Sequence, residues 1–123
     1  KGRQIINAFT FGPALVKDGE LLALDKNYGY HPHGDEPRMA IGQLGPLSYV
    51  MVLAEGRMGA SEGVTHKELA DFMYELGCEQ AFNLDGGNST VMIFNGQYYQ
   101  TGRSSSNERP QSDYIYFVTA VKP

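Results

Sequence analysis

Short apolar and β-branched runs, separated by Gly, Pro, Asn and Asp, predict a series of short strands along the chain. The runs lie at 5–11, 14–17, 20–24, 38–43, 48–54, 80–84, 91–94, 97–100 and 114–121. Asp18-Gly19 and Asn95-Gly96 each stand between two such runs, and these dipeptides are typical of the tight turn of a β-hairpin. The pattern therefore predicts two hairpins within a sheet-containing fold.

One segment has helical periodicity instead. Thr65 and Glu68 are spaced as a capping box, in which each side chain binds the free backbone N–H of the other residue. Apolar side chains follow at helical spacing, and Gly77 stands where a left-handed residue would end the helix. We therefore predict one helix over about residues 66–77.

The predicted helix separates two strand-like runs, at 48–54 and 80–84. A strand, a helix and a strand in succession are typical of the crossover that joins parallel strands. We therefore predict an α+β fold in which a mixed, mostly antiparallel sheet contains one parallel β-α-β crossover. The carboxyl ends of the two joined strands would then lie at one edge of the sheet, bringing Arg57 and Asp85 close together.

Composition and charge narrow the classes of function. A chain of 123 residues, 41% of them hydrophobic, fits one domain with a buried core. The formal net charge is -4 and no basic run occurs, so a nucleic-acid partner is not expected. No apolar run approaches the ~20 residues that a membrane helix needs, so membrane insertion is not expected. The single cysteine, Cys78, is expected to be a small buried side chain.

The segment Asp-Gly-Gly-Asn-Ser-Thr at 85–90 is the strongest candidate for a binding site. Consecutive glycines let several backbone N–H groups converge on one anion, and the hydroxyl groups that follow add donors. Arg57 would complete this cradle for a phosphate or a carboxylate with a planar guanidinium. A plain surface turn between two strands fits the same spacing equally well.

Other candidates for chemistry are weaker. His31 and His33, with Asp35 and Glu36, have the residue types of a metal site, but a solvated loop explains them better, so no metal is expected. His66 is expected to be exposed in the first turn of the helix. No nucleotide-binding glycine loop and no serine-hydrolase elbow occurs, so no cofactor is expected.

Several segments together resemble the phosphodiester glycosidase family. They read, in order, FGPALVKDGE, PRMAIGQ, EGRMGASEGVTHKELADFMYELG, NLDGGNSTVM and NERPQSD. The best-known member of that family is an N-acetylglucosamine-1-phosphodiester α-N-acetylglucosaminidase, which uncovers the mannose 6-phosphate tag of lysosomal enzymes. The resemblance implies hydrolysis of a sugar phosphodiester at its anomeric carbon, with a phosphorylated saccharide as substrate. It also implies a location outside the cytoplasm, secreted or in the cell envelope.

The resemblance also implies which residues form the site. Asp85 and Arg38 would be catalytic, and Glu108 is a candidate for a second acid. The residues that would bind the substrate and its phosphate are Arg57, Gly86, Gly87, Asn88, Ser89, Thr90 and Arg109.

The resemblance bears on the extent of the domain as well. Family domains begin with further strands, so we expect residues 1–123 to form one domain that lacks its amino-terminal part, and the missing segment to be a partner of the site. The alternative function is a non-catalytic module that binds a phosphorylated or anionic glycan of the cell envelope.

Overall fold

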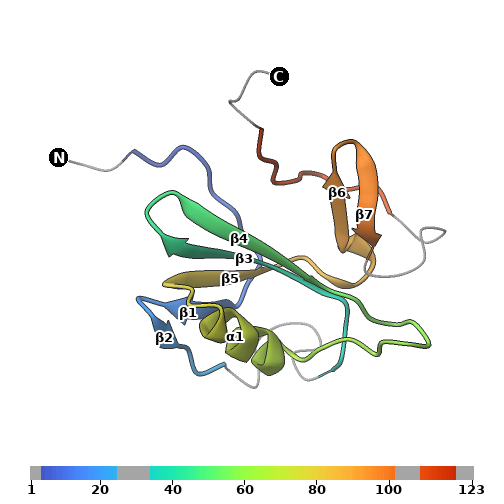
Figure 1. Ribbon diagram of the computed structural model, residues 1–123, viewed down its shortest axis with the longest axis horizontal. Helices are drawn as coiled ribbons and strands as arrows, with labels where there is room; N and C mark the ends of the chain where they lie inside the picture. Colours follow the sequence, from blue (N-terminus) through green and yellow to red (C-terminus); the bar gives the residue numbers. More distant parts are fainter. Residues whose placement is uncertain (1–3, 25–33, 102–108, 119–123) are drawn as a thin grey trace.

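The computed structural model describes residues 4–24, 34–101 and 109–118 (Figure 1). Its main sheet has five strands in the order β2-β1-β5-β3-β4, and a separate sheet has two strands, β6 and β7. The elements in chain order are β1 (Ala14–Lys17), β2 (Glu20–Leu21), β3 (Arg38–Gly45), β4 (Ser48–Ala54), α1 (His66–Glu75), β5 (Gln80–Leu84), the 3₁₀ turn η1 (Gly87–Ser89), β6 (Val91–Phe94) and β7 (Gln97–Thr101).

The predicted parallel crossover is wrong. β5 pairs with β1 on one side and with β3 on the other, and both pairings are antiparallel. β4 pairs with β3, also antiparallel, so β3 lies between the two strands that α1 connects. The connection from β4 through α1 to β5 therefore passes over β3, whose position between these strands the local sequence pattern could not predict. Because β4 and β5 both run opposite to β3, their carboxyl ends still lie at the same edge of the sheet.

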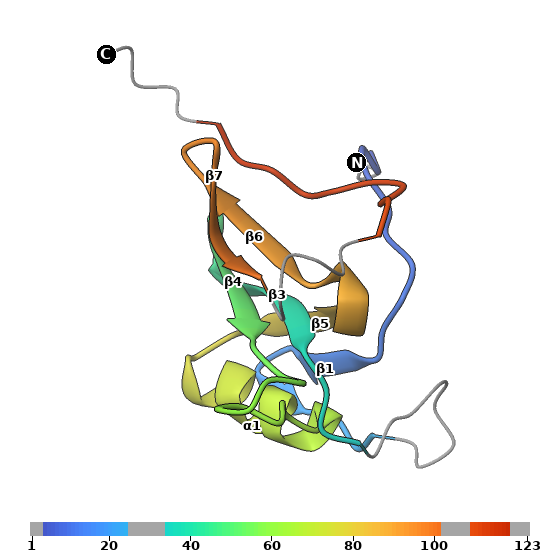
Figure 2. The same cartoon turned by 90° about the vertical axis from the view of Figure 1, so that its right-hand side faces the viewer.

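The helix covers one face of the main sheet and forms the core with it (Figure 2). The predicted capping box is present: Thr65 Oγ1 accepts from the backbone N–H of Glu68, and the Glu68 carboxylate accepts from the backbone N–H of Thr65. The helix ends at Glu75, two residues before the predicted end, and Gly77 adopts a φ of +82°. The buried core contains Leu15, Val16, Ala40, Leu69, Ala70, Met73, Cys78 and Ala81.

A glycine in the middle of β3 lets the helix approach the sheet closely. A Cβ atom at Gly42 would lie 2.5 Å from Sγ of Cys78 and 2.7 Å from Cε of Met73, which is closer than such atoms tolerate. Met73 and Cys78 therefore occupy the space that a side chain at this position would fill. The burial of Cys78 agrees with the expectation from the sequence.

Both predicted hairpins are confirmed. Asp18 and Gly19 join β1 to β2 with φ angles of +53° and +78°, and Asn95 and Gly96 join β6 to β7 with φ angles of +50° and +74°. Two successive positive φ angles are the signature of the type I′ turn that matches the twist of a hairpin. The β6–β7 hairpin and the segment 109–118 lie on the side of the main sheet away from α1 (Figures 1 and 2).

The strands predicted at 5–11 and 114–121 are not formed in the described residues. Residues 5–11 and 114–118 do not belong to a strand, and Ile5, Ile6, Tyr114 and Val118 are each at least 80% exposed. Residues 119–121 lie outside the described ranges. Apolar and β-branched composition gives a segment the tendency to form a strand, but a strand also needs a partner with which to pair.

Candidate functional site

A cleft opens at the edge of the main sheet where β3 begins and where β4 and β5 end. The register aligns Arg38 of β3 with Ala54 of β4, and Met39 of β3 with Leu84 of β5. The cleft has a volume of about 620 Å³. The residues that line it are Phe11, Gly12, Glu36, Pro37, Arg38, Arg57, His66, Asn83, Asp85, Gly86, Gly87, Asn88 and Arg109.

The glycine turn after β5 packs against the residue that precedes β3. A Cβ atom at Gly86 would lie 2.6 Å from the carbonyl oxygen of Pro37, which is closer than any side chain tolerates. Gly87 has a φ of +56°, and its N–H donates to the same Pro37 oxygen over 2.7 Å. The two glycines therefore permit a close approach of two backbone segments, and this approach places Asp85 beside the start of β3.

The turn uses several of its N–H groups internally. Ser89 N–H donates to the carbonyl of Gly86 over 3.0 Å, and Thr90 N–H donates to the carbonyl of Gly87 over 3.3 Å. The N–H of Gly87 is already bonded to Pro37. Three of the backbone N–H groups expected to converge on an anion are thus engaged within the protein. The arginine side chains are therefore the main groups of the cleft that can bind an anion.

Arg57 bridges two of the segments that line the cleft. Its Nε donates to Oε2 of Glu36 over 2.5 Å, and its Nη1 donates to Oδ1 of Asn88 over 2.9 Å. The hydrogen bond with Glu36 raises the pKa of the Arg57 guanidinium. Arg57 has a φ of +56°, a left-handed conformation that is uncommon for a residue with a Cβ atom. An unusual backbone and two side-chain bonds therefore fix the direction of this guanidinium.

Arg109 makes a second bridge, to the glycine turn. Its Nη2 donates to Oδ2 of Asp85 over 2.5 Å, and its Nε donates to Oγ of Ser89 over 2.8 Å. The side chains of Arg109 and Asp85 are 57% and 39% exposed, and ion pairs at such positions contribute little to stability. The effect of the pair is to hold the Asp85 carboxylate in one orientation at the cleft.

Arg38 is the buried cation of the cleft, with 6% of its surface exposed. Its Nε donates to the carbonyl of Val64 over 2.6 Å, and its Nη2 donates to the carbonyl of Gly34 over 2.7 Å. Its Nη1 lies 2.7 Å from Nε2 of His66. Burial lowers the pKa of the Arg38 guanidinium, and nearby carboxylates oppose this effect. These three bonds hold the guanidinium plane against the first turn of α1.

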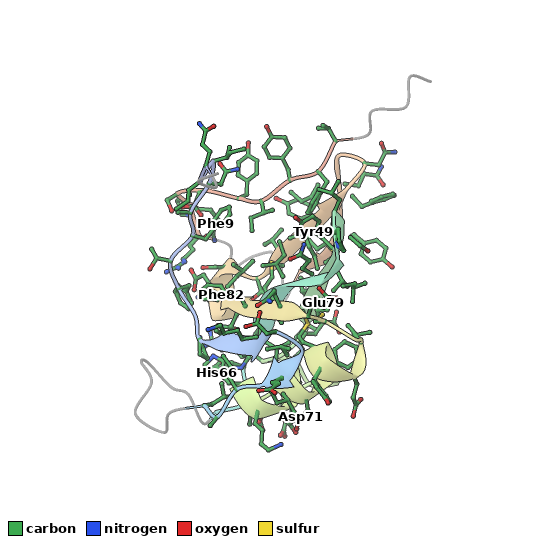
Figure 3. The ribbon with its side chains drawn as sticks, turned by 90° about the vertical axis from the view of Figure 1, so that its left-hand side faces the viewer. Phe9, Tyr49, His66, Asp71, Glu79 and Phe82 are labelled. Atoms are coloured by element: carbon green, nitrogen blue, oxygen red, sulfur yellow. The ribbon has the colours of Figure 1, made fainter. Side chains whose placement is uncertain are left out.

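His66 was expected to be exposed, and this prediction is wrong, because the side chain is 6% exposed and lines the cleft. Figure 3 shows it on the helix side of the sheet. A guanidinium can only donate, so Nε2 of His66 must accept from Arg38, and the imidazole is neutral with its proton on Nδ1. The two residues are 28 positions apart in the sequence, so no local pattern could have paired them.

Glu36 is a second carboxylate of the cleft that the sequence did not assign to this site. The lining residues include three arginines and two carboxylates, Glu36 and Asp85, so these groups leave one positive charge when the imidazole is neutral. Such a balance favours an anionic ligand. Glu108, the acid considered from the sequence, lies outside the described residues.

The structure brings together most of the residues expected at the site. Arg38, Arg57, Asp85 and Arg109 line the cleft, together with Gly86, Gly87 and Asn88. Ser89 is not among the lining residues and acts there through its bond to Arg109. Thr90 is only 1% exposed and is also absent from the lining, so its hydroxyl faces the interior of the protein. Asn83, a lining residue that is 1% exposed, was not expected.

The structure gives no sign of a metal site in the part of the chain that it describes, where no three His, Cys, Asp or Glu side chains are grouped to hold an ion. His31 and His33 lie outside that part. Among the same residues, no helix has the length and apolar character needed to cross a membrane.

Comparisons with known proteins give a family for this chain and two proteins to which it is similar. A family model described as phosphodiester glycosidase matches residues 1–118. An uncharacterized protein of Bacillus subtilis (strain 168), YomE, derived from the SPbeta prophage, is 34% identical over 92 residues, which is 75% of this chain and 14% of that protein. A crystal structure of a hypothetical protein from Synechocystis is similar with a TM-score of 0.63 and 26% identity, over 80% of this chain and 18% of that one.

The chain thus spans a small part of the relatives that it matches. The Bacillus protein is uncharacterized and the Synechocystis protein is hypothetical, so they show similarity in sequence and in fold, respectively.

Proposed function

Because this chain belongs to the phosphodiester glycosidase family, we propose that it hydrolyses a sugar 1-phosphodiester at the anomeric carbon. The observation that supports this most is the joining of the Asp85 carboxylate and three arginines in one cleft of about 620 Å³. A phosphodiester supplies negative charge for the arginines, and its sugar supplies the electrophilic carbon for the carboxylate. The proposal therefore assigns a role to both kinds of charge in the cleft.

The reaction breaks the bond between the anomeric carbon and a phosphate oxygen. The electron pair of that bond leaves with the phosphate monoester, and the oxygen of water ends on the anomeric carbon. A phosphate monoester is a good leaving group, so this step needs less proton donation than the hydrolysis of an ordinary glycoside. Asp85 supplies the carboxylate that acts at the sugar carbon, held in place by Arg109.

The arginines stabilise the negative charge that develops on the leaving phosphate. Arg57 and Arg109 are about half exposed, at 46% and 57%, and can exchange part of their contact with carboxylates for contact with phosphate oxygens. Arg38 is fixed by its three bonds and contributes a permanent positive charge from a buried position, where solvent screens it least.

The test is hydrolysis of hexose 1-(methyl phosphodiesters) by the purified protein in water enriched in ¹⁸O. Release of free sugar together with methyl phosphate that contains no label supports the proposal. Label found in the phosphate product would mean cleavage at phosphorus and would overturn it. Binding of the diester without any hydrolysis would favour the alternative, a non-catalytic module that binds phosphorylated glycans.

A pair of aspartate variants tests the role of the cleft. Asp85→Asn should lose most of the turnover, by about a thousandfold or more, because a carboxylate that acts at the reacting carbon is lost. Binding of the diester should stay measurable in that variant. Asp71→Asn alters a carboxylate on α1 that is paired with Lys67 and does not line the cleft, so it is the matched control and should keep wild-type turnover. Retained turnover in Asp85→Asn would remove this residue from the mechanism.

A further inference from the structure

The side chain of Asn83 is a buried polar group in the wall of the cleft, and it has no role in the proposed hydrolysis. It lies in β5 beside Ala40 of β3 and is 1% exposed. Its backbone is satisfied by the chain that precedes β1: its N–H donates to the carbonyl of Pro13 over 3.0 Å, and its carbonyl accepts from the N–H of Gly12 over 3.0 Å. The position of the residue is therefore fixed from both sides.

The orientation of the side-chain amide is fixed as well. Nδ2 of Asn83 donates to the carbonyl oxygen of Gly12 over 2.8 Å. That oxygen can only accept, so the amide cannot be turned over without placing two acceptors against each other. Oδ1 must therefore be the atom that faces away from Gly12.

Oδ1 of Asn83 has no hydrogen-bond partner within the described part of the chain, although it is buried. Buried acceptors without a donor are rare because they lose their bonds to water and gain none in return. Since Asn83 lines the cleft, a ligand in the cleft can supply the missing donor.

We infer that Oδ1 of Asn83 accepts a hydrogen bond from a hydroxyl group of the sugar ring, and that Asn83 is a specificity-determining residue of this site. The inference rests on the proposed function, because it takes the ligand to be a sugar phosphate. A phosphate diester has only acceptor oxygens, so it cannot satisfy Oδ1 and belongs with the arginines. A sugar hydroxyl can donate, and it satisfies Oδ1 while the phosphate contacts Arg57 and Arg109.

The spacing along the chain selects the part of the sugar that Asn83 contacts. Asn83 stands two residues before Asp85, which is about 7 Å along an extended chain. If Asp85 acts at the anomeric carbon, this spacing favours a contact between Asn83 and a hydroxyl remote from that carbon, at position 3, 4 or 6 of a hexose. Removal of that hydroxyl would leave Oδ1 buried with no donor.

The test measures binding and does not depend on turnover. The 1-phosphates of glucose, mannose, galactose and N-acetylglucosamine are compared by calorimetry, and the tightest binder is then compared with its monodeoxy and mono-O-methyl derivatives. We expect a roughly tenfold to hundredfold loss of affinity at one remote position, for the deoxy and the O-methyl derivative alike, because both lack the hydroxyl proton. Equal affinities for all derivatives, or no binding of any of these sugar phosphates, would overturn the inference.

Two variants assign the loss to Asn83. In Asn83→Ala the ratio of affinities between parent and deoxy sugar should fall to about one, because no acceptor is left to satisfy. Asn7→Ala is the matched control, since it removes the same side-chain amide at an exposed position that does not line the cleft. It should keep the full ratio. Discrimination that persists in folded Asn83→Ala would also overturn the inference.

The outcome separates this inference from the proposed function. Sugar selectivity through Asn83 without hydrolysis would support the inference and contradict the activity, whereas labelled hydrolysis with no selectivity for a remote hydroxyl would do the reverse. If Asn83→Ala does not fold, as judged by urea unfolding, the derivatives tested on the wild-type protein still decide the outcome.

Discussion

The substitution Gly86→Ala tests whether the glycine turn is shaped by close packing. The new Cβ atom would lie 2.6 Å from the carbonyl oxygen of Pro37, whereas an ordinary contact begins at 3.4 Å, so the turn must move by about 0.8 Å. Pro37 is itself fully buried and precedes β3, so it cannot yield easily. Overpacking of this kind destabilises proteins by about 1–3 kcal/mol.

The same displacement reaches the carboxylate that we propose to be catalytic, because Asp85 is the residue before Gly86. A misplacement of about 1 Å can lower a reaction rate about a hundredfold. We therefore expect Gly86→Ala to lose about a hundredfold in kcat/KM for the diester and to shift the urea midpoint in the same sense. If no turnover can be measured, affinity for a hexose 1-phosphate is the readout.

The matched control for this variant is Gly59→Ala. Gly59 lies in the chain after β4, has no atom within 4 Å of a Cβ built on it, and has no left-handed φ, so the methyl group enters open space. This variant should behave like the wild type. Wild-type kinetics and stability in Gly86→Ala would refute the view that the turn is held against Pro37.

Three further predictions concern the fold. Gly42→Ala should destabilise the protein by about 1–3 kcal/mol in urea unfolding, because its Cβ meets core side chains, whereas Gly45→Ala in the same strand should not; equal midpoints would contradict the packing. Backbone and side-chain hydrogen bonds from Thr65 lower the pKa of Glu68 below the ordinary 4.5, so its contribution to stability is present above that pH and is lost as pH falls through the lowered value. Glu68→Gln should remove this loss of stability at acid pH. Urea unfolding of both proteins at a series of pH values measures it, and an identical dependence of the unfolding free energy on pH in the two proteins would contradict the prediction. Burial raises the pKa of Cys78, so its thiol should react with a disulfide reagent at pH 8 far more slowly in buffer than in urea, and equal rates would show that it is accessible.

The parts of the fold that the sequence predicts well are set by residues close together in the chain. The capping box of Thr65 and Glu68 spans three residues, and each hairpin turn is set by a dipeptide that accepts positive φ. The order of strands in the main sheet has no such local origin. It depends on β5 entering between β1 and β3, and hence on packing such as that of Met73 in the space left by Gly42.

The same distinction holds for the site. Asp85 and Arg57 are recognised because they follow strands and belong to segments that resemble a known family. His66 and Asn83 acquire their meaning only from contacts with Arg38 and Gly12, which lie 28 and 71 residues away in the sequence. Their residue types are common in cores and on surfaces alike, so a single sequence carries no signal for them.

The two ion pairs of the cleft have a consequence for how quickly and how selectively a ligand is received. Arg57 is fastened to Glu36 and Asn88, and Arg109 to Asp85 and Ser89, so both long side chains have given up most of their rotamer freedom in advance. The two guanidinium groups are therefore preorganised, and binding an anion costs little further side-chain entropy. The same arrangement favours an anion whose oxygens reach both guanidinium groups while each keeps part of its contact with its carboxylate.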